Sequence, residues 1–202
     1  MRPVLLATRN QGKVAELARI LEPFGLSLVG ASYEPGPETG ATFAENALAK
    51  AFEGVRETGL PSVADDSGLA VEALNGMPGI FSARWAGRHG DDLANLELVL
   101  GQLTDVPDER RGAAFVCAAA WALPDGRNHV ELGELRGTVI REPRGTGGFG
   151  YDPVFVPFGL DVTSAELLPA EKDAISHRGK AFRALAPTLA IALGHGHGHG
   201  HG

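Results

Sequence analysis

The stretch that decides the fold is residues 113–135, AAFVCAAAWALPDGRNHVELGEL. It opens with a continuous apolar run, Ala113 to Leu123, which is typical of a buried strand. Pro124-Asp125-Gly126 follows as a strong turn sequence, and the residues around His129–Leu135 predict a return strand. The stretch therefore predicts a long β-hairpin.

The N-terminal segment predicts a different kind of unit. Residues 3–8 indicate a short buried strand, residues 14–21 place apolar side chains at helical spacing, and residues 26–29 indicate a second strand after Gly25. Strand–helix units combined with hairpins favour an α/β fold with a mixed sheet.

Other signals predict the remaining elements. Thr42 and Glu45 form a capping box, in which each side chain satisfies a free backbone N–H at a helix start, and this helix should end near Thr58. A short strand is expected at Ser62–Ala64, ending in Asp65-Asp66-Ser67-Gly68. A further helix should be capped by Asp91 or Asp92, with Leu93, Leu96, Leu100 and Leu103 on one face. Strands should begin at Val139 and at Val154, and a last helix should cover Ser176–Leu193 with an interruption at Pro187.

The composition excludes several classes of protein. The 202 residues carry a formal charge of −7, which disfavours binding to a nucleic-acid backbone, and no apolar stretch reaches the roughly 20 residues of a membrane span. Cys117 is the only cysteine and lies in the apolar run, so we expect a packing role and a reducing, cytoplasmic location. The N-terminus lacks the pattern of a signal peptide. Residues 195–202 alternate His and Gly, and we expect a disordered tail, either native or an affinity tag.

The first chemical candidate is TRNQGK, residues 8–13, at a strand-to-helix junction. Backbone N–H groups at a helix start bind anions, and the dipole there disfavours a cation such as Lys13 unless a negative ligand is bound. Thr8 and Asn10 carry further hydrogen-bonding groups. The alternative is that Asn10 is only an N-cap and Lys13 a solvated side chain.

Asp65-Asp66 is the acidic candidate. Adjacent residues of a strand face opposite sides, so one carboxylate can hold Mg²⁺ or a water in a cleft while the other organises its surroundings. The alternative is a polar turn, since Asp, Ser and Gly favour turns. The cationic candidates, Lys172 and SHRGK at 176–180, again place positive charge at a helix start, which favours a phosphate ligand.

GTGGFGYD, residues 145–152, contains a formal G-x-G-x-x-G. A dinucleotide-binding turn requires a helix after the last glycine, whereas Pro153 and the run that follows predict a strand. We therefore expect a loop on which a flat ligand can lie, with Phe149 stacking on a base and Asp152 accepting a hydrogen bond or assisting a metal. The alternative is a hairpin turn.

Taken in order, TRNQGK, TFAENALAKA, ADDSGLAVEALNGMPGIFSARWAG, GTGGFGYDPVF and EKDAISHRGKA resemble the inosine triphosphate pyrophosphatase family, also called XTP/dITP diphosphatases. The likeness spans residues 3–194. It implies one two-lobed α/β domain over residues 1–194, with a long twisted mixed sheet flanked by helices and a nucleotide cleft between the lobes. It also implies Mg²⁺-dependent hydrolysis of ITP, dITP and XTP to monophosphate and pyrophosphate by a cytoplasmic homodimer.

The resemblance also assigns roles to individual residues. It implies that Asp66 is the proton acceptor and a metal ligand, with Glu38 as a second metal ligand. Asp65 stays open as the alternative base, and Lys13 is a further catalytic candidate. Arg178 is implied to read a 6-oxo group. The implied substrate contacts are Thr8, Arg9, Asn10, Gln11, Gly12, Lys13, Lys50, Ser67, Phe149, Gly150, Tyr151, Asp152, Lys172, His177 and Arg178.

Two positions depart from the expected family pattern: Arg9 replaces a common glycine and Trp85 a common tyrosine. Two other functions stay open: a Maf-like pyrophosphatase acting on modified pyrimidines or other nucleotides, and a nucleotide-binding module without catalysis.

Overall fold

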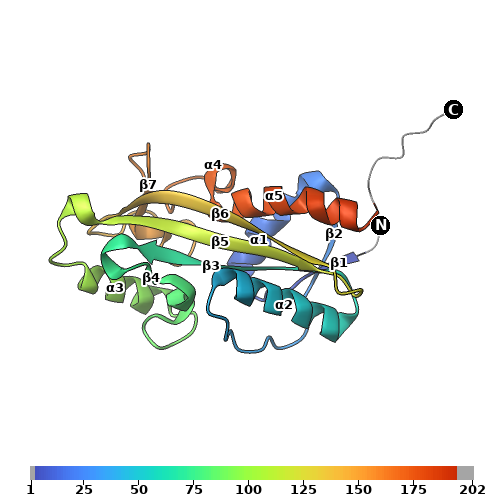
Figure 1. Cartoon of the computed structure of the whole chain (residues 1–202). Helices are drawn as coiled ribbons and strands as arrows, with labels where there is room; N and C mark the ends of the chain where they lie inside the picture. The colour runs from blue at the N-terminus through green and yellow to red at the C-terminus, as the bar shows by residue number, and fades with distance from the viewer. Residues whose placement is uncertain (1–2, 195–202) are drawn as a thin grey trace.

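The computed structural model describes residues 3–194, so the predicted disorder of the Gly-His tail concerns residues outside the described part. One mixed sheet runs the length of the protein, with strand order β2-β1-β3-β5-β6-β7 and β4 paired to β3 (Figure 1). The strands are β1 (Pro3–Leu6), β2 (Ser27–Gly30), β3 (Ser62–Val71), β4 (Met77–Pro78), β5 (Gly112–Ala122), β6 (Asn128–Val139) and β7 (Phe155–Pro157).

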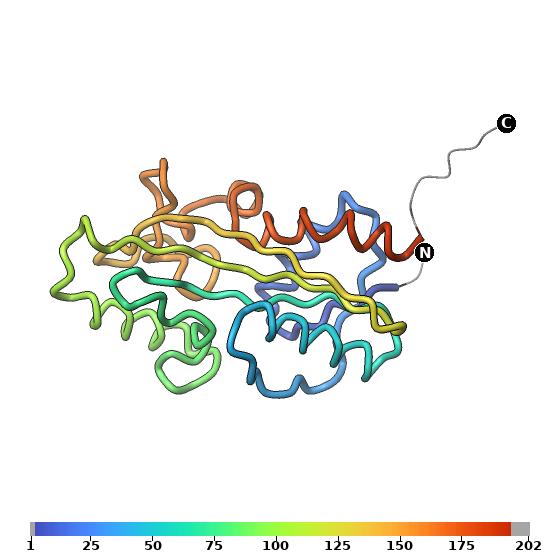
Figure 2. Tube along the Cα trace, in the orientation of Figure 1, coloured from blue at the N-terminus to red at the C-terminus, as the bar shows by residue number. Residues whose placement is uncertain are grey.

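The sheet combines the two predicted kinds of unit. β1 is parallel to β2 and β3, whereas β5 is antiparallel to β3 and β6. The β5–β6 hairpin pairs from Ala122↔Asn128 to Gly112↔Thr138, which confirms the long hairpin predicted around Pro124-Asp125-Gly126. Figure 2 shows these long strands crossing the molecule together.

Helices cover both faces of the sheet, as the α/β prediction requires. Figure 1 shows α1 and α5 on one side and α2 on the other. The structure contains α1 (Gln11–Leu21), α2 (Phe43–Thr58), α3 (Asp92–Gln102), α4 (Pro169–Ile175) and α5 (His177–Ala192), with 3-10 turns at Glu22–Phe24, Glu72–Leu74, Gly79–Arg84, Asp108–Arg110 and Asp152–Val154. Among the described residues, no helix is long and apolar enough to cross a bilayer.

Three apolar clusters fix this arrangement. One joins α1 and α5 to the sheet through residues such as Leu17 and Phe182, and a second packs alanines of α2 against the opposite face. The third lies toward the other end of β3 and includes Leu69 of that strand together with Leu96 and Val99 of α3. The long strands therefore connect a lobe that contains α1, α2 and α5 with a lobe that contains α3.

The predicted helix caps are present. Thr42 Oγ1 accepts a hydrogen bond from Glu45 N at 3.1 Å, so the predicted N-cap of α2 is confirmed. Glu45 Oε2 accepts from Ala41 N at 2.7 Å and not from Thr42 N, so the reciprocal half of the predicted capping box is shifted by one residue. Of the two candidates at α3, Asp91 is the cap, because its Oδ1 accepts from Ala94 N at 3.2 Å.

The short strand predicted at 62–64 is wrong in its length. β3 continues to Val71, and the two acids lie in its middle. Turn-forming residues are tolerated here because β5 pairs with every residue from Ser62 to Val71 and satisfies the backbone. The polar-turn interpretation of Asp65-Asp66 is therefore also wrong.

Three smaller expectations need correction. Val139 ends β6 and does not begin a new strand. Leu93 is 66% exposed and does not belong to the buried face of α3, whereas Leu96 and the C-cap Leu103 are buried as predicted and Val99 is buried with them. Pro187 lies inside α5, which continues past it because side chains on both sides, such as Phe182 and Leu189, are buried in the core.

Candidate active site

A cleft of about 440 Å³ opens between the lobes. Most of the residues that the sequence singled out line it, although they come from segments that are far apart in the chain. Three exceptions lie outside its lining: Asp65, Gln11 and Gly12. The predicted residues in the lining are Thr8, Arg9, Asn10, Lys13, Glu38, Lys50, Asp66, Ser67, Phe149, Gly150, Tyr151, Asp152, Lys172, His177 and Arg178.

The loop before α1 supplies the first wall. Asn10 Oδ1 accepts a hydrogen bond from Lys13 N at 3.2 Å, so Asn10 is the N-cap of α1, as the alternative interpretation of this segment predicted. Lys13 is not a solvated side chain: its Nζ lies 3.0 Å from Asp65 Oδ2. The charge that the helix dipole disfavours is thus held in place by a buried carboxylate.

Asp65 and Asp66 face opposite sides of β3, as the alternation of a strand requires. Asp65 faces α1 and α5 and accepts from Lys13 and from Arg178 Nε at 3.2 Å. Asp66 faces α2, where Asn46 Nδ2 donates to its Oδ2 at 2.9 Å and Lys50 Nζ lies 3.5 Å from its Oδ1. Only Asp66 of the two lines the cleft.

The two acids also differ in charge environment. Burial by itself raises the pKa of Asp65, but Lys13 and Arg178 outweigh burial and hold that pKa well below its usual range. Burial raises the pKa of Asp66, and Lys50 offsets only part of that effect. Asp66 is thus the better proton acceptor of the pair, whereas Asp65 is a fixed anion.

Glu38 and Lys50 extend the acidic side of the cleft. Lys50 Nζ lies 2.6 Å from Glu38 Oε1, so this lysine bridges the two predicted metal ligands, Glu38 and Asp66. Within residues 3–194, no group of three or more His, Cys, Asp or Glu side chains is placed to hold a metal ion. Mg²⁺ usually takes only one or two carboxylates and completes its shell with phosphate oxygens and water, so these two acids fit Mg²⁺ bound together with a nucleotide.

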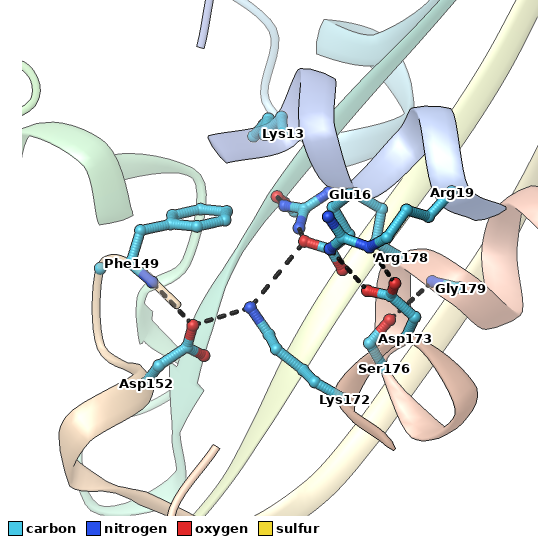
Figure 3. A network of polar contacts seen from close by, with 12 residues as sticks. Lys13, Glu16, Arg19, Phe149, Asp152, Lys172, Asp173, Ser176, Arg178 and Gly179 are labelled. Atoms are coloured by element: carbon cyan, nitrogen blue, oxygen red, sulfur yellow. Dashed lines mark hydrogen bonds and ion pairs between the residues drawn. The ribbon is translucent and has the colours of Figure 1, made fainter. Parts of the chain in front are cut away.

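Arg178 lies at the centre of a buried ion-pair network, shown in Figure 3. Arg178 is 2% exposed. In addition to the bond from its Nε to Asp65, its Nη1 donates to Glu16 Oε2 at 2.8 Å and its Nη2 donates to Ser67 Oγ at 2.6 Å. Lys172 of α4 continues the network, since its Nζ lies 3.8 Å from Glu16 Oε2 and 2.8 Å from Asp152 Oδ2. Because Lys172 lies in α4, it does not belong to the start of α5, which carries His177 and Arg178.

The glycine-rich loop holds an aromatic ring over these cations. Lys172 Nζ lies 4.8 Å and Arg178 Cζ 5.5 Å from the centre of the Phe149 ring. Gly12 makes room for that ring, because a Cβ atom added there would lie 2.8 Å from Phe149 Cδ1. The 3-10 turn Asp152–Val154 and β7 follow the loop, so the prediction that it is no dinucleotide-binding turn is confirmed.

His177 and Cys117 are buried beside the network. The His177 ring stacks on Phe115 with centroids 4.9 Å apart, and burial, reinforced by Arg178 and Lys172, lowers the pKa of His177 well below its ordinary value. His177 is therefore a neutral imidazole at pH 7. Cys117 is fully buried, as its predicted packing role requires, and burial raises the pKa of its thiol.

With this geometry in view, the relationship to known proteins is direct. The model of the Ham1 family matches residues 4–188. This chain belongs to the Ham1 family. Among its Ham1 relatives, the dITP/XTP pyrophosphatase of Nocardia farcinica is 61% identical over 197 residues, covering 94% of this chain and 96% of that protein. That of Streptomyces coelicolor is 61% identical over 195 residues, covering 94% and 98%.

Solved Ham1 structures share the fold. The nucleoside-triphosphatase / dITP/XTP pyrophosphatase from Mycobacterium abscessus superposes with a TM-score of 0.74 at 58% identity, covering 93% of this chain and 99% of that one. A HAM1 protein from Coxiella burnetii superposes with a TM-score of 0.85 at 40% identity, covering 95% and 100%.

Several residues of this Ham1 cleft escaped the sequence-based prediction. Glu16 and Asn46 hold Arg178 and Asp66, and their partners lie 162 and 20 positions away, so only the folded chain reveals them. A signal existed for Glu16, because a carboxylate on the buried face of an amphipathic helix requires a partner. The segment after β4 contributes further lining residues, among them the titratable side chains Arg84, His89 and Asp92.

Proposed function

We propose that this chain hydrolyses non-standard purine nucleoside triphosphates, namely dITP, XTP and ITP, to the nucleoside monophosphate and pyrophosphate. This removes deaminated purines from the nucleotide pool. The observation that carries the proposal is the arrangement of one cleft, where Asp66 faces the cavity between lysines at one side and an aromatic ring at the other. The names of the Nocardia and Streptomyces relatives support dITP and XTP as substrates.

The two sides of the cleft suit the two ends of a nucleotide. Lys13 and Lys50 flank Asp66 and would bind the triphosphate. Phe149 would stack on the purine, at the side where Asp152 and Arg178 carry hydrogen-bonding groups. The substrate would therefore span from the α1 loop to the glycine-rich loop.

Asp66 is the better candidate for the base that activates water. It lines the cleft and burial raises its pKa, whereas Asp65 is committed to Lys13 and Arg178. In this mechanism Asp66 accepts a proton from the water that attacks the α-phosphorus, and the bond to pyrophosphate breaks. Lys13 and Lys50 neutralise the charge that develops on the phosphates.

Asp66 and Glu38 would hold Mg²⁺ together with phosphate oxygens. When bound, the ion would supply charge neutralisation of the triphosphate and of the leaving pyrophosphate. Lys50 between these carboxylates would keep them close together before substrate arrives.

Arg178 would select for a 6-oxo purine. Among the described residues its guanidinium makes three hydrogen bonds, and arginine has five N–H donors, so donors remain for a purine oxygen. Its position is fixed by Asp65 and Glu16, which makes the donors rigid. Adenine presents an amino group at this position and would leave a buried donor unpaired, which discriminates strongly.

Release of pyrophosphate from ITP, XTP, dITP, ATP and GTP, measured with and without Mg²⁺, tests the proposal. We expect hydrolysis of the first three to exceed that of ATP and GTP by at least about tenfold and to require the metal. The Arg178 contact accounts for discrimination against ATP; guanine shares the 6-oxo group, so discrimination against GTP must act on its 2-amino group. Equal turnover of all five would contradict the specificity. A preference for modified pyrimidines would favour the Maf-like alternative, and tight binding without pyrophosphate release would favour a binding module.

We further propose that residues 1–194 fold as one two-lobed domain and that the protein is a cytoplasmic homodimer. β3, β5 and β6 run through both lobes, which supports a single folding unit. The single cysteine fits a reducing compartment. Light scattering after size exclusion tests the dimer, because a mass near the 21.1 kDa of one chain would contradict it.

A further inference from the structure

Asp92, the first residue of α3, forms a hydrogen bond that its own helix does not require. Asp91 already caps α3. The Asp92 carboxylate instead reaches across to the glycine-rich loop, where its Oδ2 accepts from Gly150 N at 3.0 Å. Both residues line the cleft.

The loop that Asp92 contacts, residues 145–152, depends on contacts from outside as well as on its own hydrogen bonds. Gly145, Gly148 and Gly150 all have positive φ angles, of 87°, 67° and 63°. Glycine adopts this conformation without steric cost, but it also has the most conformational freedom to lose, so a loop built in this way depends on outside contacts.

Those contacts fall into two groups. Toward the C-terminal part of the chain, Gly147 N donates to Ala165 O at 2.9 Å, and Asp152 pairs with Lys172. Toward the segment that runs from β4 to α3, Tyr151 Oη donates to Ser82 O at 2.7 Å and Gly150 N donates to Asp92. The loop therefore bridges two parts of the protein, and Asp92 provides one of the two ties on its second side.

The bond to Asp92 acts on the peptide that follows Phe149. The N–H of Gly150 belongs to the peptide group that also contains the Phe149 carbonyl, so fixing it fixes the backbone from which the Phe149 ring extends. The Phe149 N–H on the other side of that residue donates to Asp152 Oδ2 at 2.9 Å. The ring is thus held by one carboxylate on each side of its residue.

We infer that Asp92 is a positioning residue for purine binding: it holds the Phe149–Gly150 peptide so that the Phe149 ring is placed to stack on the base. This inference rests on the proposed function, because it takes the Phe149 side of the cleft as the base side. Asp92 acts on the base end of the substrate and leaves the phosphate end unchanged.

The negative charge of Asp92 allows a charge effect and a positioning effect to be told apart by the direction in which nucleotide affinity changes. A carboxylate that acted on the triphosphate through its charge would repel it, and both Asp92→Ala and Asp92→Asn would then bind nucleotide more tightly. A positioning role predicts a different pattern, because Asn keeps a side-chain oxygen that accepts the Gly150 hydrogen bond and Ala does not.

The experiment measures ITP hydrolysis and inhibition by the two products, IMP and pyrophosphate. For Asp92→Ala we expect the KM for ITP and the inhibition constant of IMP to rise together by about fivefold, with the inhibition constant of pyrophosphate unchanged. Asp92→Asn should stay within about twofold of the wild type. Asp91→Ala is the matched control; it removes the α3 cap, so it should lower Tm and leave the IMP constant unchanged.

Several results would overturn the inference: an unchanged KM in Asp92→Ala, tighter binding in both variants, or an equal rise in the IMP and pyrophosphate constants. The last would indicate a general loosening of the cleft. A wild-type protein that releases no pyrophosphate from ITP would instead contradict the proposed function. The two failures are therefore distinguishable.

Discussion

Asp65 and Asp66 are neighbours in β3, yet their carboxylates lie on opposite faces of the sheet and their pKa values shift in opposite directions. Asp65 neutralises buried cations of α1 and α5. Asp66 faces the cleft, where burial favours its protonated form. The same side chain thus serves as a structural anion at one position and as a candidate base at the next.

Removing each acid should therefore have a different effect. Asp66→Asn should lower kcat for ITP by about 10²–10⁴-fold with little change in Tm, because it removes the proton acceptor and leaves every buried cation with a partner. Asp65→Asn leaves Lys13 and Arg178 without their shared carboxylate and should lower the free energy of unfolding by about 3 kcal/mol or more. Pyrophosphate-release kinetics and urea unfolding measure both. Near-normal turnover by Asp66→Asn would show that another group is the base.

Stability should depend on pH through His177. Burial lowers its pKa well below the ordinary value, so on acidification the unfolded chain takes up a proton near pH 6.5 that the folded chain does not bind. The unfolded state then binds more protons, and stability must fall as pH falls below about 6.5, by at most about 1.4 kcal/mol per pH unit.

The comparison with His177→Gln isolates this contribution. Urea unfolding at pH 7.5 and 5.5 should show a larger loss of stability in the wild type than in the variant. Buried carboxyls such as Asp66 and Asp152, whose pKa values are raised by burial, contribute with the opposite sign but equally in both proteins. Identical losses in the two proteins would contradict a buried neutral His177.

Gly12→Ala should weaken base binding without weakening the fold. The new methyl group would lie 2.8 Å from Phe149 Cδ1, which is closer than van der Waals contact allows, so the ring would be displaced. Alanine itself favours the helix. We expect the KM for ITP to rise roughly fivefold, since base–aromatic stacking contributes about 1–3 kcal/mol. Gly30→Ala is the control, because a Cβ atom there meets nothing within 4 Å. An unchanged KM in Gly12→Ala would show that the ring does not stack on the substrate.

Arg111 should be among the most sensitive positions for stability. It is 2% exposed, and it donates to the carbonyls of Leu103 at 2.6 Å, Val139 at 2.8 Å and Ile140 at 3.3 Å. Arg111→Ala removes these bonds and leaves a cavity, so urea unfolding should show a loss of about 3 kcal/mol or more. The exposed neighbour Arg110 should tolerate alanine within about 0.5 kcal/mol, and equal effects would contradict this assignment.

The sequence predicts those parts of the protein that depend on local chemistry. Thr42 caps α2 as expected through the N–H of Glu45, three residues away, and the hairpin turn at Pro124-Asp125-Gly126 lies where its residues favour it. The extent of β3 was not predictable in this way. Its turn-forming residues are overruled by pairing with β5, which is fixed by tertiary structure.

The site shows the same division. Lys13, Asp66, Phe149 and Arg178 were found from motifs, and the cleft brings them together. Asp92 and Glu16 were missed because each acts on a residue distant in sequence, Gly150 or Arg178, and neither lies in a recognisable pattern. The division of labour between the two aspartates was left open, since it depends on which face of β3 meets which helix.

The central position of the acids in β3 limits how this chain can vary. Because side chains alternate along a strand, one residue inserted before Asp65 within β3 would exchange the faces of the two carboxylates and disconnect the base from the cleft. Changes in length within this part of β3 are therefore not tolerable. Redesign toward a different nucleobase should begin with substitutions on the base side of the cleft, at residues 145–152, because these leave the alternation of β3 untouched.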